Sequence, residues 1–135
     1  MPLSTPDALI HLMVVAASSD ARISPSEIER IDGLIDQSPV FDSFDRSRLV
    51  AVANDCVDKI NGGADLETVL DDAVAAIPQR LHDTAYALAV EITAVDLRLE
   101  QEELRLLEMI RDRLDLDRLV TAAIETAARA RFRHA

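Results

Sequence analysis

The chain has 135 residues, of which 49% are apolar and only three are glycine, so its composition supports a buried core and argues against disorder. Its formal net charge of −11 disfavours nucleic-acid binding and leaves cations, or an unknown protein partner with a basic surface, as ligands. No stretch approaches the ~20 apolar residues of a membrane span. A single cysteine cannot form an internal disulfide, so the expected location is the cytoplasm.

Start and stop signals divide the first half of the chain into four predicted helices. A Thr-Pro-Asp sequence at residues 5–7 starts the first one, and the run that follows is apolar on nearly all sides, which predicts a central helix. Ser24 and Glu27 have the spacing of a capping box at the start of the second. The predicted ranges are about 5–18, 24–38, 43–60 and 65–76.

The second half of the chain predicts three more helices, at about 78–95, at about 100–114 and from about 117 towards the C-terminus. No segment alternates with the period of two that is typical of strands. The predicted fold class is therefore all-α: a single compact bundle of about seven helices that forms one domain over residues 1–135.

One motif occurs twice, 76 residues apart: Asp20-x-Arg22-Ile23-x-x-x-Glu27 and Asp96-x-Arg98-Leu99-x-x-x-Glu103. Each copy follows an apolar helix and leads into a helix with apolar residues at helical spacing. This pattern predicts an internal helix-loop-helix repeat with units at about 8–37 and 84–113. We expect the two units to superpose around a pseudo-twofold axis, with Asp20 and Asp96 on the same side of the molecule.

The acidic residues of the motif have two roles that the sequence leaves open. If the two loops meet, Asp20, Glu27, Asp96 and Glu103 together offer four carboxylates, which are ligands for a divalent cation such as Mg²⁺, Ca²⁺ or Mn²⁺. Neither copy alone has the ligand spacing of an EF-hand.

In the alternative role, each carboxylate accepts hydrogen bonds from its own loop or helix start. Arg22 and Arg98 then neutralise the acids by ion pairs.

Glu91 and His11 interrupt apolar helical runs. Glu91 is expected to form an ion pair with an arginine, because a buried carboxylate needs a partner, and it is also a supporting candidate for the acidic site. His11 lies nine residues before Asp20, about 13 Å along a helix axis, so it is expected to be a core histidine rather than a ligand of that loop.

Other singled-out residues have structural interpretations. Cys56 lies on a core-facing stripe and is expected to be a buried thiol. Tyr86 is expected to pack with its hydroxyl reaching a partner. His82, near a helix start, is expected at the surface. Three arginines between residues 129 and 133 form a basic cluster, which suits the C-terminal end of a helix.

The repeated motif resembles the tellurite-resistance TerB family and the related DnaJ-like co-chaperone domain. The similarity extends from about Ala8 to about Thr126 and is most specific in 16–27 and 85–103. It implies a seven-helix bacterial domain, cytoplasmic or peripheral to the inner membrane, with a role in metal-oxyanion or envelope stress. It also implies that Asp20, Glu27, Asp96 and Glu103 bind metal ions. Many members have glycine after each Asp, where this chain has Ala21 and Leu97.

The expected function is a non-enzymatic TerB-like binding or adaptor module of the stress response, for which a divalent cation at the paired acidic loops is an open option. One alternative is a protein-interaction domain whose acidic loops only brace the fold. A hydrolase with a carboxylate-held metal is a further alternative, but the sequence has no Ser-His-Asp pattern, P-loop or zinc-ligand spacing.

Overall fold

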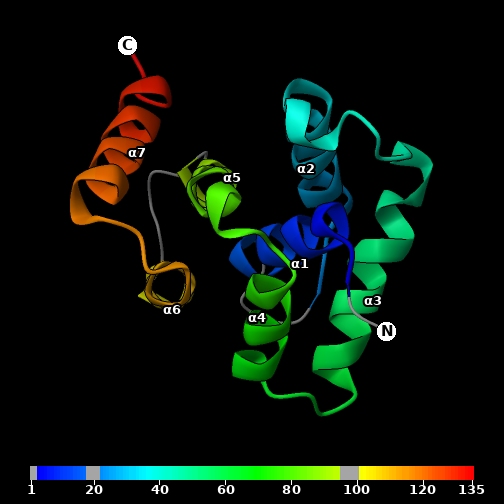
Figure 1. Ribbon diagram of the computed structural model, residues 1–135. Coiled ribbons are helices and arrows are strands. Elements are labelled where there is room, and N and C mark those ends of the chain that lie inside the picture. The colour runs from blue at the N-terminus through cyan, green and yellow to red at the C-terminus, as the bar shows by residue number, and fades with distance from the viewer. Residues whose placement is uncertain (1–2, 18–21, 95–100) are drawn as a thin grey trace.

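The computed structural model describes residues 3–17, 22–94 and 101–135, without the side chains of residues 94 and 101–104. These residues form seven α-helices and no strand (Figure 1), which confirms the predicted all-α class. The α-helices are α1 (Thr5–Ala17), α2 (Pro25–Gln37), α3 (Leu49–Asn61), α4 (Leu66–Ala75), α5 (His82–Ala94), α6 (Gln101–Leu114) and α7 (Arg118–Arg131). Three short 3₁₀ helices join them: η1 (Pro39–Phe41), η2 (Arg46–Arg48) and η3 (Gln79–Leu81).

Helix α1 is the centre of the bundle. All nine residues from Ala8 to Ala16 are buried, because the sequence is apolar around the whole circumference of this helix. Helices α3, α4, α5 and α6 pack around it, and its most extensive contact is with α5. No helix among the described residues is long and apolar enough to cross a membrane.

The predicted capping box of α2 is present. Ser24 Oγ accepts a hydrogen bond from the Glu27 amide at 3.2 Å, and Glu27 Oε1 accepts one from the Ser24 amide at 3.0 Å. Asp65 and Asp117 cap α4 and α7 in the simpler way, by accepting from amides of the first helical turn. Local sequence signals therefore set these helix starts.

The helix predicted from residue 43 begins later, at Leu49. Asp45 accepts a hydrogen bond from the Ser47 amide at 3.0 Å and starts the 3₁₀ helix η2, and Arg46 binds Asp32 and Asp36 of α2 at 2.7 and 2.8 Å. These contacts hold the chain in a separate turn before α3. The helix predicted from Pro78 likewise begins as η3 and becomes α-helical at His82.

The prediction that His82 lies at the surface is wrong. Its imidazole is partly buried, with Nδ1 3.1 Å from the carbonyl oxygen of Leu114 and Nε2 3.0 Å from that of Ile77. Carbonyls at or just beyond a helix end lack partners within the helix, and His82 lies where α5 starts beside the ends of α4 and α6. The histidine therefore joins three helices.

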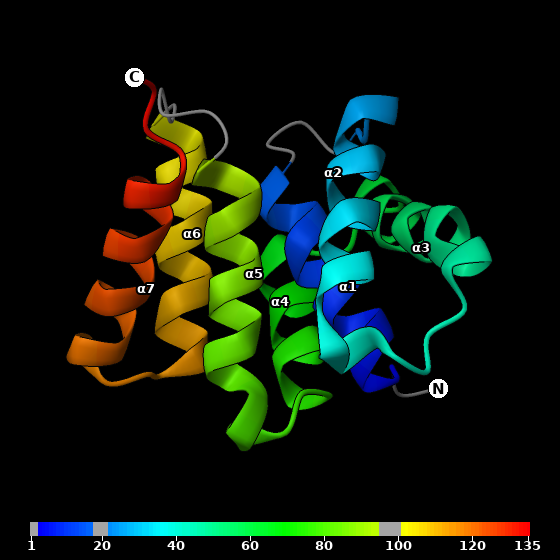
Figure 2. The ribbon, with the colours of Figure 1, turned by 90° about the horizontal axis from the view of Figure 1, so that it is seen from above.

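The helix pairs of the two repeat units, α1–α2 and α5–α6, are arranged in the same way. Figure 2 shows α1 and α5 side by side and running in the same direction, each followed by a helix that returns, α2 and α6 respectively. The C-terminal ends of α1 and α5 and the N-terminal ends of α2 and α6 thus lie at one end of the molecule. Below, we call this the motif end. Superposition of residues 8–37 on 84–113 stays a prediction.

Candidate functional site

Glu27 is the one predicted metal-ligating residue whose side chain the structure describes. Its Oε1 belongs to the capping box of α2, whereas its Oε2 is buried and has no hydrogen-bond partner among the described residues. Capping explains the first oxygen and leaves the second unexplained. A buried carboxylate oxygen without a donor is costly, so this atom needs a further donor or a cation beyond the described contacts.

The structure describes only some of the other residues of the predicted site. Asp20, Asp96 and Arg98 lie outside the described residues, and Glu103 is placed in α6 without its side chain. Arg22 precedes α2 and is exposed. Whether the four carboxylates meet therefore stays a prediction, and no group of three His, Cys, Asp or Glu side chains suited to a metal occurs among the described residues.

One contact joins two of the helices that flank the two copies of the motif. Arg30 of α2 donates a hydrogen bond from Nη1 to the carbonyl oxygen of Ile92 in α5 at 3.2 Å. Arg30 lies about one helical turn after Glu27, and Ile92 lies in the last turn of α5. The start of α2, from the first copy, is therefore attached to the end of α5, which leads into the second copy.

Glu91 forms the predicted ion pair. Its Oε1 accepts from Arg131 of α7, and the Glu91 side chain is only 20% exposed. The pair joins α5 to the C-terminal end of α7, where the arginine side chain also lies over the Phe132 ring at 5.2 Å. Glu91 thus has a structural partner, and its supporting role in an acidic site is untested.

Burial shifts the pKa values of two side chains that lie between α1 and α3. Burial raises the pKa of the Cys56 thiol to about 11, so the nucleophilic thiolate is scarce near neutral pH. Burial, with a smaller contribution from Lys59, lowers the pKa of His11, whose Nδ1 has no hydrogen-bond partner among the described residues. Both residues are in the core, as expected.

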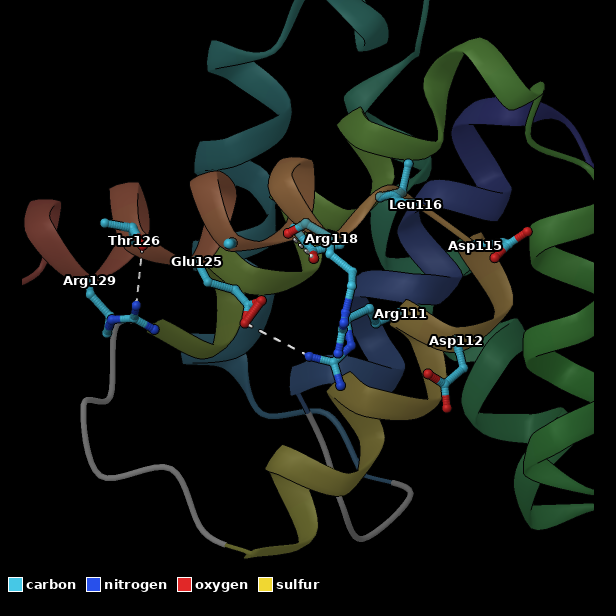
Figure 3. A pocket seen from close by; sticks show the side chains of 10 residues that line it. Arg111, Asp112, Asp115, Leu116, Arg118, Glu125, Thr126 and Arg129 are labelled. Atoms are coloured by element: carbon cyan, nitrogen blue, oxygen red, sulfur yellow. Dashed lines mark hydrogen bonds and ion pairs between the residues drawn. The ribbon is translucent and has the colours of Figure 1, made fainter.

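A polar pocket of about 660 Å³ lies between the end of α6 and α7 (Figure 3). Arg111 and Glu125 point toward each other there, with 3.9 Å between Arg111 Nη1 and Glu125 Oε1. Tyr86 of α5 is buried, and both Glu125 and Arg111 affect the protonation of its hydroxyl. Burial and the Glu125 carboxylate raise the pKa of Tyr86 to about 12, while Arg111 opposes this effect. The expectation of a packed tyrosine with a polar partner is confirmed.

This polar pocket does not favour a ligand of one charge. Three arginines and three acids line it: Arg111, Arg118, Arg129, Asp112, Asp115 and Glu125. Their charges balance, so the field in the pocket has no dominant sign. We assign it no ligand.

A second hollow, of about 800 Å³, follows α5 between the start of α1 and the end of α2. Glu91 lines it and also lines a smaller pocket of about 190 Å³ beside Arg131. Sequence reasoning found Glu91 because an acid in an apolar run is conspicuous. The sequence did not predict either hollow. Each is lined by residues from several helices that are far apart in the chain, and no local sequence pattern marks them.

Comparison with known proteins agrees with these observations. No curated protein and no solved structure matches the chain. The family model described as tellurite resistance protein TerB matches residues 6–126. This range contains both copies of the repeated motif and the starts of helices α2 to α7. The chain therefore belongs to the TerB family.

Proposed function

We propose that this TerB-family chain is a non-enzymatic binding or adaptor module of the stress response, and that its motif end holds a divalent cation. The ligands would be the carboxylates of Asp20, Glu27, Asp96 and Glu103. The observation that carries this proposal is the buried Oε2 of Glu27, which has no hydrogen-bond partner among the described residues.

The layout of the motif end supports a shared site. The helices that flank both copies of the motif begin or end there, and Arg30 attaches the start of α2 to the end of α5. Carboxylate oxygens suit Mg²⁺, Ca²⁺ or Mn²⁺ better than softer metals. A bound cation would also relieve the mutual repulsion of acids in a protein with a net charge of −11.

The state of the buried reactive groups supports a binding role rather than catalysis. The Cys56 thiol and the Tyr86 hydroxyl have pKa values raised to about 11 and about 12, far above the range in which a nucleophile or general base operates at neutral pH. His11 is enclosed in the core. A partner with a basic surface is the class of protein that the charge of this chain favours.

Thermal unfolding with Mg²⁺, Ca²⁺ or Mn²⁺ tests the cation. A ligand at 100 times its dissociation constant adds about 2.7 kcal/mol to the free energy of unfolding, which is a shift of several degrees in Tm. We expect a saturable shift in the wild type and none in the double variant Asp20→Asn, Asp96→Asn. The matched control Asp42→Asn, Asp58→Asn removes two exposed acids and should keep the shift.

Glu27→Gln separates the two roles of this residue. Glutamine at the third helical position preserves a capping box but lacks the charge of a ligand. If Glu27 binds the cation, the variant stays folded and loses most of the ion-induced shift. If none of the three ions shifts the wild-type Tm beyond ionic screening, and the double asparagine variant is itself destabilised, the cation proposal fails and the acids brace the fold.

A further inference from the structure

The outer face of α7 is apolar, and no element of the described part of the chain covers it. Leu119 is 80% exposed and Val120 is 38% exposed, which makes them two of the three large hydrophobic residues that the described chain exposes. Exposed small residues continue the face along the helix to residue 130. The full set is Leu119, Val120, Ala123, Ala127 and Ala130.

The other sides of α7 are occupied. Thr121 and Ala128 are buried on the side toward α5, which is the main packing partner of this helix. Arg118, Glu125 and Arg129 line the polar pocket on a neighbouring side (Figure 3). Figures 1 and 2 both place α7 at the edge of the bundle, and none of the described helices lies beyond it.

The lack of charge on this outer face is unusual for its surroundings. Charged residues make up 29% of the chain, and the solvent-facing side of a surface helix normally carries them. Over residues 119–130 the face formed by these residues carries none, and the exposed Arg129 lies beside it, at the polar pocket. Such a face is typical of a helix that packs against another helix.

The charges at the two ends of α7 indicate what that other helix is. Asp115 and Asp117 precede the helix and outnumber Arg118, its first residue, whereas arginines at 129, 131 and 133 follow along its other end. Among the described residues neither Asp115 nor Arg133 has an ion-pair partner. A second α7 in antiparallel orientation would place each acidic end beside a basic end, whereas a parallel one would oppose like charges.

We propose that α7 packs antiparallel on α7 of a second copy of this chain, forming a twofold-symmetric dimer. Such an interface is self-complementary, because the same face serves both copies. With the axis near residue 125, Leu119 of one copy lies against Ala130 of the other. The alanines at 123 and 127 face their counterparts near the centre, where small side chains allow close approach of the helices.

The size of the helix sets the expected strength of the dimer. Helix α7 has 14 residues and is about 21 Å long. A single helix pair of this length buries less than the roughly 1,600 Å² of a standard stable interface. We therefore expect a reversible dimer whose population rises with protein concentration, and this association does not depend on cation binding.

Sedimentation velocity over a wide concentration range tests the dimer. Leu119→Asp and Ala123→Glu each place a charge in the proposed interface and should leave the protein monomeric at concentrations where the wild type is dimeric. Val50→Asp is the matched control, because Val50 is 54% exposed but lies on α3. It should dimerise like the wild type, and circular dichroism should show all variants folded.

Cysteine cross-linking tests the orientation. Leu119→Cys and Ala130→Cys should each fail to form an interchain disulfide alone but form one when the two variants are mixed. The native Cys56 is buried and does not interfere. A wild type that is monomeric at all concentrations would overturn the proposal, as would a dimer that Leu119→Asp and Ala123→Glu leave intact. Efficient self-cross-linking of Leu119→Cys would overturn the antiparallel arrangement.

Discussion

The ion pair between Glu91 and Arg131 should make a measurable contribution to stability, although one partner is exposed. It connects residues 40 positions apart and attaches the end of α7 to α5. The Glu91 side chain is 20% exposed and that of Arg131 is 62% exposed. Arg131→Gln removes the positive charge and leaves a largely buried carboxylate without its ion-pair partner.

The exposures of the two partners set the expected size of the effect. A fully exposed pair contributes about 0.2–1 kcal/mol, and a hydrogen bond to a charged group contributes about 1.5–3 kcal/mol. Because solvent screens the arginine but reaches little of the glutamate, we expect Arg131→Gln to lower the free energy of unfolding by about 1–1.5 kcal/mol. Loss of the contact with the Phe132 ring is included in that figure.

Urea unfolding followed by circular dichroism measures this loss, at a protein concentration low enough to keep the chain monomeric. Arg129→Gln is the matched control, because Arg129 is exposed and its side chain donates only to the Thr126 hydroxyl among the described residues. A double-mutant cycle with Glu91→Gln should give a coupling energy of about 1 kcal/mol. Equal effects of Arg131→Gln and Arg129→Gln, with no coupling, would refute the reasoning.

Two further predictions concern the core between α1 and α3. Burial lowers the pKa of His11 below its ordinary 6.5. As the pH falls below 6.5, this side chain therefore binds a proton in the unfolded chain before it does so in the folded chain. Its contribution to stability is complete above pH 6.5 and falls as the pH drops toward the folded-state pKa, and urea unfolding of His11→Gln should show a flatter pH dependence in this window. Burial also raises the pKa of Cys56 to about 11, so a thiol reagent at pH 8 should react with it only as fast as the protein opens. Rapid labelling of the folded protein would contradict this.

Local sequence determined most of the helical architecture. The all-round apolar run after Pro6 made α1 the central helix, and the spacing of Ser24 and Glu27 set the start of α2 through a capping box. Glycine and aspartate signals placed the C-terminal end of α3 and the start of α4. These features depend on residues within one or two turns of each other, so they can be read without knowing how the helices pack.

Part of the candidate site was also readable from the sequence. The repeated motif singled out Glu27, whose second carboxylate oxygen is buried without a hydrogen-bond partner in the described part of the chain. That Asp20, Asp96 and Glu103 join it stays a prediction. The position of Glu91 in an apolar run indicated a need for an arginine, but many arginines were available and only packing selected Arg131.

The tertiary structure alone decided which distant groups meet and which surface stays uncovered. The two ring nitrogens of His82 lie against carbonyl oxygens at the ends of two other helices, and Arg30 of α2 reaches the backbone of α5. The sequence of α7 shows an apolar side, but only the packing shows that its outward side is left open at the edge of the bundle. The physical reason is that these contacts depend on the relative placement of helices, which arises from burial of the whole core and not from any local pattern.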